Sequence, residues 1–215
     1  MLSPKTLKLL ANLLILTGIL GLLILFSPLL TTELRYRLQT HRSSPPTLIP
    51  KSKKEVEKTT PNPPLQLIKP ASWDFGILIP KIFVNSPVVT NVDFYNPDSY
   101  RPALKKGVAH AKGSSLPGQP GRIFLFAHST DSPLHFKQYN AVFYLLYKLQ
   151  PGDAVYLFYQ NRRYQYKVVD RQLLTPNQLE KLLAASPSTE LLTLQTCWPP
   201  GTTLKRLVVN AIPAP

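Results

Sequence analysis

The sequence contains a single thiol side chain that could act as a nucleophile. Cys197 is the only cysteine among 215 residues, and it lies within the stretch LQTCWPPGTTLKR, residues 194–206. A lone cysteine cannot form an internal disulfide, so it is either an inert packed thiol or a reactive one. A reactive thiol needs a base that removes its proton, and attack on a carbonyl also needs a group that stabilises the resulting oxyanion. Thiol chemistry at Cys197 therefore requires two further residues.

The base is sought among the histidines. The chain has four of them: His41, His110, His128 and His135. His128 directly follows the apolar run RIFLFA, residues 122–127, just as Cys197 directly follows LLTLQT, residues 191–196. Side chains at the ends of neighbouring strands share one rim, where a site can form without disturbing the core. This arrangement favours His128 as the partner of the thiol.

Arg206 is the candidate for the stabilising cation. It follows the connection WPPGTTLK and begins the run RLVVNAI, residues 206–212. If the strands of Cys197 and Arg206 are antiparallel neighbours, the connection folds back and brings the guanidinium near the sulfur. Such a charge favours both thiolate and oxyanion, and it is not lost near neutral pH. Each residue also has an ordinary interpretation: a packed cysteine, a hydrogen-bonding surface histidine and a solvated arginine.

The elements that would position these residues are mostly short strands. Six apolar and β-branched runs are separated by turn signals: residues 76–84, 122–127, 154–159, 164–170, 191–196 and 206–212. Short, evenly spaced strands predict a mainly β domain that forms a closed barrel or a sandwich. The break QNRR after the third run predicts a hairpin turn, in which Asn161 can adopt a positive φ.

Two helices are predicted within this β framework. Residues 175–185 have Thr175 as N-cap, Pro176 at the first helical position and Gln178 where a capping-box partner belongs. Residues 135–147, HFKQYNAVFYLLY, have an apolar helical spacing, but their aromatic content also allows a strand or a loop.

The N-terminal part of the chain differs in composition from the rest. Residues 7–30 are almost entirely apolar and long enough to cross a bilayer, so residues 1–30 are predicted to be an uncleaved signal anchor, with a cleaved signal peptide as the alternative. Residues 31–70 are rich in proline and lysine and predict a disordered stalk, and residues 71–215 form the predicted globular domain. The formal charge is +14, and many of the basic residues lie in the stalk. Because the sequence shows no basic helix interleaved with aromatic residues, nucleic-acid binding is not expected.

Three blocks of sequence resemble the sortases, the membrane-anchored cysteine transpeptidases of bacterial envelopes. TLQTCWPPGTTLKRLVV, residues 193–209, resembles the sortase pattern Thr-Leu-x-Thr-Cys, a short loop and Arg-Leu-Val-Val. GVAHAKGSSLPGQPGRIFLFAH, residues 107–128, resembles the segment that leads to the catalytic histidine, and GILIPKIFVNSPVV, residues 76–89, resembles the opening strand. The blocks occur in family order and span nearly all of residues 76–212.

The resemblance implies a closed eight-stranded sortase-type β-barrel with short helices. It implies Cys197 as nucleophile, His128 as acid and base, and Arg206 as the residue that steadies the substrate carbonyl or oxyanion. Three further residues are implied to bind substrate or support the site: Thr196, His110 and Trp198. For His110, a structural or substrate-wall role is favoured over a catalytic one. The histidine motif departs from the family, because Phe-Ala-His-Ser-Thr stands where many sortases have Gly-His-Arg.

The implied reaction is transpeptidation. The enzyme would cleave a Leu-Pro-x-Thr-Gly-like sorting signal of surface proteins or pilins through a thioacyl intermediate, and would join the protein to a cell-wall precursor or a pilin lysine. The implied topology places the N-terminus in the cytoplasm and the domain outside the cell. No cofactor is needed, and the 11 acidic residues include no dense loop for calcium. Two alternatives stay open: a hydrolase that uses water as acceptor, and an envelope-tethered binding module with an unreactive Cys197.

Overall fold

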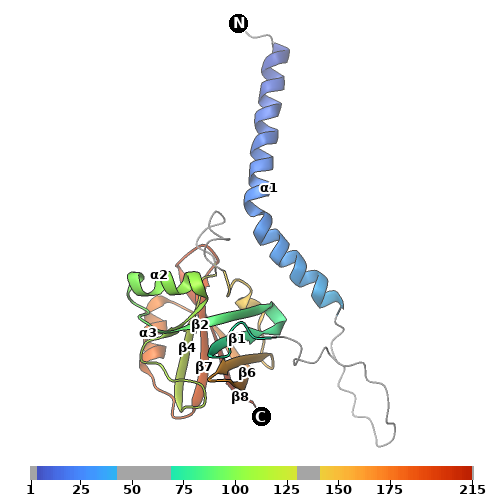
Figure 1. Ribbon diagram of the computed structural model, residues 1–215. Helices are drawn as coiled ribbons and strands as arrows, with labels where there is room; N and C mark the ends of the chain where they lie inside the picture. The colour runs from blue at the N-terminus through green and yellow to red at the C-terminus, as the bar shows by residue number, and fades with distance from the viewer. Residues whose placement is uncertain (1–3, 43–68, 130–140, 215) are drawn as a thin grey trace, which may run out of the picture.

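The computed structural model describes residues 4–42, 69–129 and 141–214 (Figure 1). A long N-terminal helix, α1 (Pro4–Arg42), leads into a β domain with two further α-helices, α2 (Pro97–Lys106) and α3 (Pro176–Ala184). The strands of the domain are β1 (Phe75–Ile79), β2 (Val84–Val92), β3 (Val108–Ala111), β4 (Gly121–Phe126), β5 (Ala154–Tyr159), β6 (Arg162–Leu174), β7 (Glu190–Trp198) and β8 (Lys205–Pro213).

These strands close into a barrel in the order β1-β2-β3-β4-β7-β8-β6-β5. Only the pairs β2–β3 and β4–β7 are parallel, and the other six neighbouring pairs are antiparallel. The prediction of a closed eight-stranded barrel is therefore confirmed. The first apolar run, residues 76–84, covers β1 except Phe75 and reaches the first residue of β2, because a short 3₁₀ helix, η2 (Pro80–Ile82), turns the chain between the two strands.

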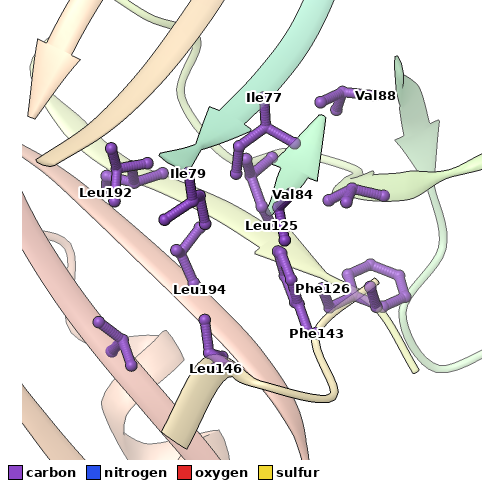
Figure 2. Close-up of a cluster of buried hydrophobic side chains, with 14 of the residues drawn as sticks. Ile77, Ile79, Val84, Val88, Leu125, Phe126, Phe143, Leu146, Leu192 and Leu194 are labelled. Carbon is purple, nitrogen blue, oxygen red and sulfur yellow. The ribbon is translucent and has the colours of Figure 1, made fainter. Parts of the chain in front are cut away.

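The barrel is filled by apolar side chains from all around the sheet. Leu192 and Leu194 of β7 point into this core together with Leu125 of β4 and Ile77 and Ile79 of β1 (Figure 2). Each of these side chains is at most 1% exposed, and full burial of such a side chain contributes roughly 1.5–3 kcal/mol. Because side chains alternate along a strand, the odd-numbered residues of β7 face the outside of the barrel.

Both α-helices of the domain begin at capping residues. Asn96 caps α2 by accepting a hydrogen bond from the Asp98 amide at 3.0 Å. Thr175 caps α3, and Gln178 completes the capping box, as the sequence predicted. The hairpin turn between β5 and β6 is also as predicted, since Gln160 and Asn161 both have positive φ, 50° and 60°.

The second predicted helix does not form over residues 141–147. Residues 141–149 instead make tight turns and a short 3₁₀ helix, η4 (Leu146–Lys148), so the loop alternative is the correct one there; residues 135–140 lie outside the described residues. Phe143, Leu146 and Leu149 recur every third residue and are all fully buried. A spacing of three matches the 3₁₀ period, and hydrogen bonds from Leu146 N to Phe143 O (3.1 Å) and from Leu149 N to Leu146 O (3.2 Å) follow it.

Helix α1 extends beyond the segment expected to cross the membrane. Among the described residues, one stretch, Pro4–Leu23, is long and apolar enough to span a bilayer, with a mean hydropathy of 2.0, which suggests membrane anchoring. The sequence analysis assigned residues 31–42 to a disordered stalk, and the structure differs because these residues continue the helix. A pair between Glu33 and Arg37, one turn apart at 3.2 Å, supports it, and the sequence SSPP follows Arg42. The rest of the predicted stalk up to residue 68 lies outside the described residues.

Candidate active site

Cys197 and Arg206 lie directly opposite each other on neighbouring strands. β7 and β8 are antiparallel, and their register pairs Cys197 with Arg206 and Gln195 with Val208. Directly opposed residues of an antiparallel pair project from the same face with Cβ atoms about 4.5–5.5 Å apart. The connection after Cys197 therefore folds back as expected, and the two strands are antiparallel neighbours.

His128 approaches Cys197 from the other side of β7. β4 runs parallel to β7 with Phe126 opposite Gln195, so two further residues along each chain bring His128 level with Cys197 and on the same outer face. The pairing continues past the end of β4, because Ala127 N donates to Gln195 O at 3.2 Å. β7 thus stands between the strand that leads to the imidazole and the strand that carries the guanidinium.

Backbone contacts hold the His128 segment in place after its strand has ended. The Thr196 hydroxyl donates to Ala127 O at 2.8 Å, and Thr196 is only 1% exposed. On the other side, the Phe143 amide donates to His128 O at 3.2 Å, and Phe143 is anchored in the core. This hydrogen bond of Thr196 therefore ties the segment that contains His128 to the strand that carries Cys197.

The three side chains line one cavity on the outside of the barrel. This cavity has a volume of about 550 Å³, and Cys197, His128 and Arg206 all contribute to its wall. α2 and α3 lie over this side of the barrel (Figure 1), and they supply further wall residues, among them Arg101 and Glu180. All three of the predicted catalytic side chains are half-buried, so each is held by its neighbours while its functional group reaches the cavity.

The guanidinium of Arg206 is fixed by the connection between β7 and β8. Its Nη1 donates to Thr203 O at 2.8 Å and to Lys205 O at 3.2 Å. Thr202 and Thr203 of the same connection also line the cavity. A planar guanidinium that is held by carbonyl groups keeps its orientation, which suits it to bind a developing negative charge.

His110 lies away from this cavity, inside the barrel. It pairs with Leu125 in the β3–β4 ladder, is 5% exposed, and packs against the Phe75 ring with centroids 5.6 Å apart. Its Nε2 donates to Ser115 O at 2.9 Å, and burial lowers the pKa of the imidazole below its usual value. His110 does not line the cavity, and its surroundings are those of a structural residue.

Trp198 follows the cysteine but packs away from the cavity. It packs against the core and against the Tyr147 ring, with centroids 5.1 Å apart and planes at 50°. It is not among the residues that line the cavity. The indole therefore connects the end of β7 to the η4 segment.

Several residues of the cavity wall were not predicted from the sequence. Only Gln195 could have been found from the sequence. It is a polar residue in an apolar strand and lies two residues before Cys197, so it faces the same side of the strand. Tyr95 enters the wall from the loop before α2, Tyr100 and Arg101 enter from α2 itself, and Glu180 enters from α3. Their sequence neighbourhoods carry no sign of the cavity, because only the packing of the helices on the barrel brings them there.

In the described part of the chain, no group of three or more His, Cys, Asp or Glu side chains is arranged to hold a metal ion. The groups gathered at the cavity are a thiol, an imidazole and a guanidinium. This set can form a thiolate, move a proton and stabilise an oxyanion, which are the requirements of acyl transfer at a carbonyl.

Comparison with known proteins gives consistent matches. A family model described as the sortase domain matches residues 77–214. Sortase D of Bacillus subtilis (strain 168) is 29% identical over 125 residues, which are 58% of this chain and 54% of that protein. The chain thus spans about half the length of this curated relative.

Solved structures of similar proteins share the fold. Sortase C-1 from Actinomyces oris is 29% identical with a TM-score of 0.54, covering 66% of this chain and 73% of that one. Sortase A from Corynebacterium diphtheriae is 28% identical with a TM-score of 0.55, covering 67% and 61%. Pilus-related sortase C of Group B Streptococcus is 27% identical with a TM-score of 0.54, covering 70% and 71%. The predicted barrel type is thereby confirmed.

Proposed function

The chain belongs to the sortase family, a family of transpeptidases, and we propose that it cleaves a sorting signal with Cys197 and transfers the acyl part to an amine. The signal resembles Leu-Pro-x-Thr-Gly and lies near the C-terminus of a surface protein or pilin. One observation carries the proposal: the register of β4, β7 and β8 aligns His128, Cys197 and Arg206 side by side on one face, and all three line one cavity.

The first half-reaction forms a thioacyl enzyme. The Cys197 thiolate attacks the threonine carbonyl carbon, a carbon–sulfur bond forms, and the carbonyl electron pair moves onto oxygen. Arg206 binds this oxyanion through its guanidinium, which the carbonyl groups of Thr203 and Lys205 hold in place. The carbonyl then re-forms, the carbon–nitrogen bond breaks, and His128 gives a proton to the departing amine.

The second half-reaction reverses these roles. An incoming amine attacks the thioester carbonyl and gives a proton to His128, and the Cys197 thiolate leaves. The product is a new amide between the substrate protein and the acceptor, which is a cell-wall precursor or the lysine of a pilin. No step draws on a metal ion or an organic cofactor.

The proposed location follows from the helix that precedes the domain. α1 includes a stretch long enough to cross a membrane, and we place the N-terminus in the cytoplasm and the barrel on the outer side. There the cavity meets exported proteins and cell-wall precursors. A reporter fused before Met1 or after Pro215 checks this orientation by its accessibility to added protease.

The proposed reaction is tested by product analysis with the full chain in detergent. Sorting-signal peptides are incubated with and without candidate amines, and the products are identified by mass. We expect an amine-linked product that disappears in Cys197→Ala, while the melting temperature of this variant stays close to that of the wild type. An amine-linked product of undiminished yield from Cys197→Ala contradicts the mechanism.

Two other results of the same experiment identify the alternatives. Release of the cleaved peptide as a free acid, at a rate that added amine does not change, indicates a hydrolase that uses the same three residues. No product, together with a Cys197 thiol that reacts with alkylating probes like a free cysteine across pH, indicates a binding module.

A further inference from the structure

Helix α1 contacts the catalytic domain through the carboxylate of Glu33. This carboxylate accepts hydrogen bonds from the Tyr147 hydroxyl at 3.1 Å and from Lys148 Nζ at 2.9 Å, and Arg37 of the same helix donates to it at 3.2 Å. The Glu33 and Lys148 side chains are only 24% and 22% exposed. Burial alone would raise the pKa of Glu33, but the hydrogen bonds from Lys148, Arg37 and Tyr147 together hold it below the usual value. The group is therefore a carboxylate at neutral pH.

The segment that receives this contact is held rigidly by the barrel. Leu146 and Leu149, on either side of the contact, are fully buried. Arg171 of β6 donates from Nη1 to the carbonyl oxygens of Tyr147 and Leu149. The Tyr147 and Lys148 side chains thus project from a fixed backbone, and Lys148 Nζ also lies 4.9 Å from the centre of the Tyr147 ring.

The Tyr147 side chain joins this contact to the end of the catalytic strand. Its hydroxyl reaches Glu33, while its ring packs against Trp198, the residue that follows Cys197. Trp198 pairs with Lys205, next to the pair of Cys197 and Arg206. A chain of contacts therefore runs from α1 through one tyrosine ring to the turn that holds the thiol and the guanidinium.

We propose that Glu33 is a positioning residue: helix α1 braces Tyr147 against Trp198 and thereby fixes the ends of β7 and β8 that carry Cys197 and Arg206. The expected effect on kcat rests on the proposed function, whereas the expected effect on the packing of Trp198 does not. Without the Glu33 carboxylate, the Tyr147 hydroxyl and the Lys148 ammonium lose their shared partner. The indole is then packed less firmly, and the oxyanion-binding geometry is less well held.

If Glu33 positions Tyr147 against Trp198, its substitution should change the solvent exposure of Trp198. A contact that only holds α1 to the domain should leave that exposure unchanged. The experiment uses the full chain in detergent micelles with Trp73→Phe as background, so that Trp198 is the only tryptophan. In Glu33→Gln we expect the acrylamide quenching constant of Trp198 to rise about twofold and kcat to fall roughly 3- to 10-fold, with KM unchanged within about twofold. Tyr147→Phe keeps the ring but loses the hydroxyl, and it should shift both quantities in the same direction.

A control and a rescue accompany these variants. Asp153→Asn breaks a comparable ion pair, Lys81–Asp153 at 2.7 Å, whose side chains are 29% and 20% exposed and do not line the cavity. It should leave Trp198 quenching and kcat unchanged. The charge reversal Glu33→Lys with Lys148→Glu restores the ion pair and should recover both quantities in part.

Two results would contradict the proposal that Glu33 positions Tyr147 against Trp198. One is Trp198 quenching in Glu33→Gln equal to that of the background protein, and the other is a charge reversal that recovers neither quantity. If the background protein transfers no peptide at all, the proposed function fails, and the quenching measurement still decides whether Glu33 braces Trp198.

Discussion

At the scale of single residues, the side chains at the cavity divide the chemistry between reactivity and orientation. Cys197 and His128 supply the nucleophile and the proton carrier of the proposed reaction. Arg206 supplies charge and geometry together, because Nη1 is held by the carbonyls of Thr203 and Lys205. Thr196 contributes only position, through its hydrogen bond to Ala127 O.

The proposed role of Arg206 predicts that a positive charge alone does not stabilise the oxyanion as well as a guanidinium. Arg206→Lys keeps a cation but loses the planar fork that two carbonyl groups orient, so kcat should fall by about 10- to 100-fold. Steady-state kinetics with a sorting-signal peptide and an amine measure the change. Arg162→Lys, on the exposed start of β6, is the matched control and should match the wild type. Equal kcat values in the two variants would remove Arg206 from the chemistry.

His110 predicts a pH dependence of stability that is separate from catalysis. Burial lowers its folded-state pKa below the unfolded value of 6.5, so below about pH 6.5 the unfolded chain binds more protons than the folded one. The stabilising contribution of neutral His110 should therefore be complete above that pH. Below it, the free energy of unfolding should decrease as the pH drops toward the folded-state pKa of His110. The contribution of one such group is at most about 1.4 kcal/mol per pH unit.

Urea denaturation of the barrel domain between pH 5 and 8 measures this dependence. His110→Gln keeps a donor for Ser115 O but does not titrate, so its free energy of unfolding should vary less with pH than that of the wild type. Identical pH dependences in the two proteins would show that another group is responsible.

At the scale of elements, β7 determines which residues meet. Its even-numbered residues, such as Leu194, fill the barrel, while Cys197 faces the cavity between β4 and β8. Both neighbours were predictable to different degrees. The pairing of β7 with β8 follows from a short local connection. For β4, a distant segment, the sequence indicated only that His128 and Cys197 share one rim, and the parallel pairing of β4 with β7 was not predicted.

Other elements were less readable in the sequence. β3, Val108–Ala111, is only four residues long, too short to show a clear strand pattern. Residues 143–149 carry apolar side chains at both helical and 3₁₀ spacing, and burial of Phe143, Leu146 and Leu149 decides between them. Arg101 and Glu180 reach the cavity only through packing of α2 and α3 on the barrel, a tertiary effect that local patterns do not encode.

At the scale of the whole molecule, a long helix contacts the barrel domain at Tyr147 and Lys148, and the Tyr147 ring packs on the end of β7. The charge of +14 and the proline-rich stretch suggested that the helix and the barrel are joined by a solvated spacer. The contact of Glu33 with Tyr147 and Lys148 was not predictable, because a lone glutamate after an apolar segment has no distinctive pattern. In our two proposals, the helix anchors the protein in the membrane and also positions the residues at the end of β7.

Removal of residues 1–70 separates these two roles. Among the side chains whose burial the structure describes, none from α1 belongs to the barrel core, so residues 71–215 should give a soluble protein that unfolds cooperatively. If Glu33 acts only as a brace, this domain should retain transfer with kcat lowered as far as in Glu33→Gln. Circular dichroism during heating and the kinetic assay check both parts. An insoluble product would place the domain boundary elsewhere.

The two pairings that build the cavity enclose very different lengths of chain. β7 and β8 are joined by the short connection from Trp198 to Lys205, whereas the pairing of β4 with β7 spans residues 126 to 190. Because nearby contacts form with less loss of chain entropy, the hairpin should form before the parallel pair. A molecule in which only this hairpin has formed would have Arg206 opposite Cys197 but would lack His128 beside it. The proposed base would reach the thiol only after β4 has paired with β7 and the barrel has closed.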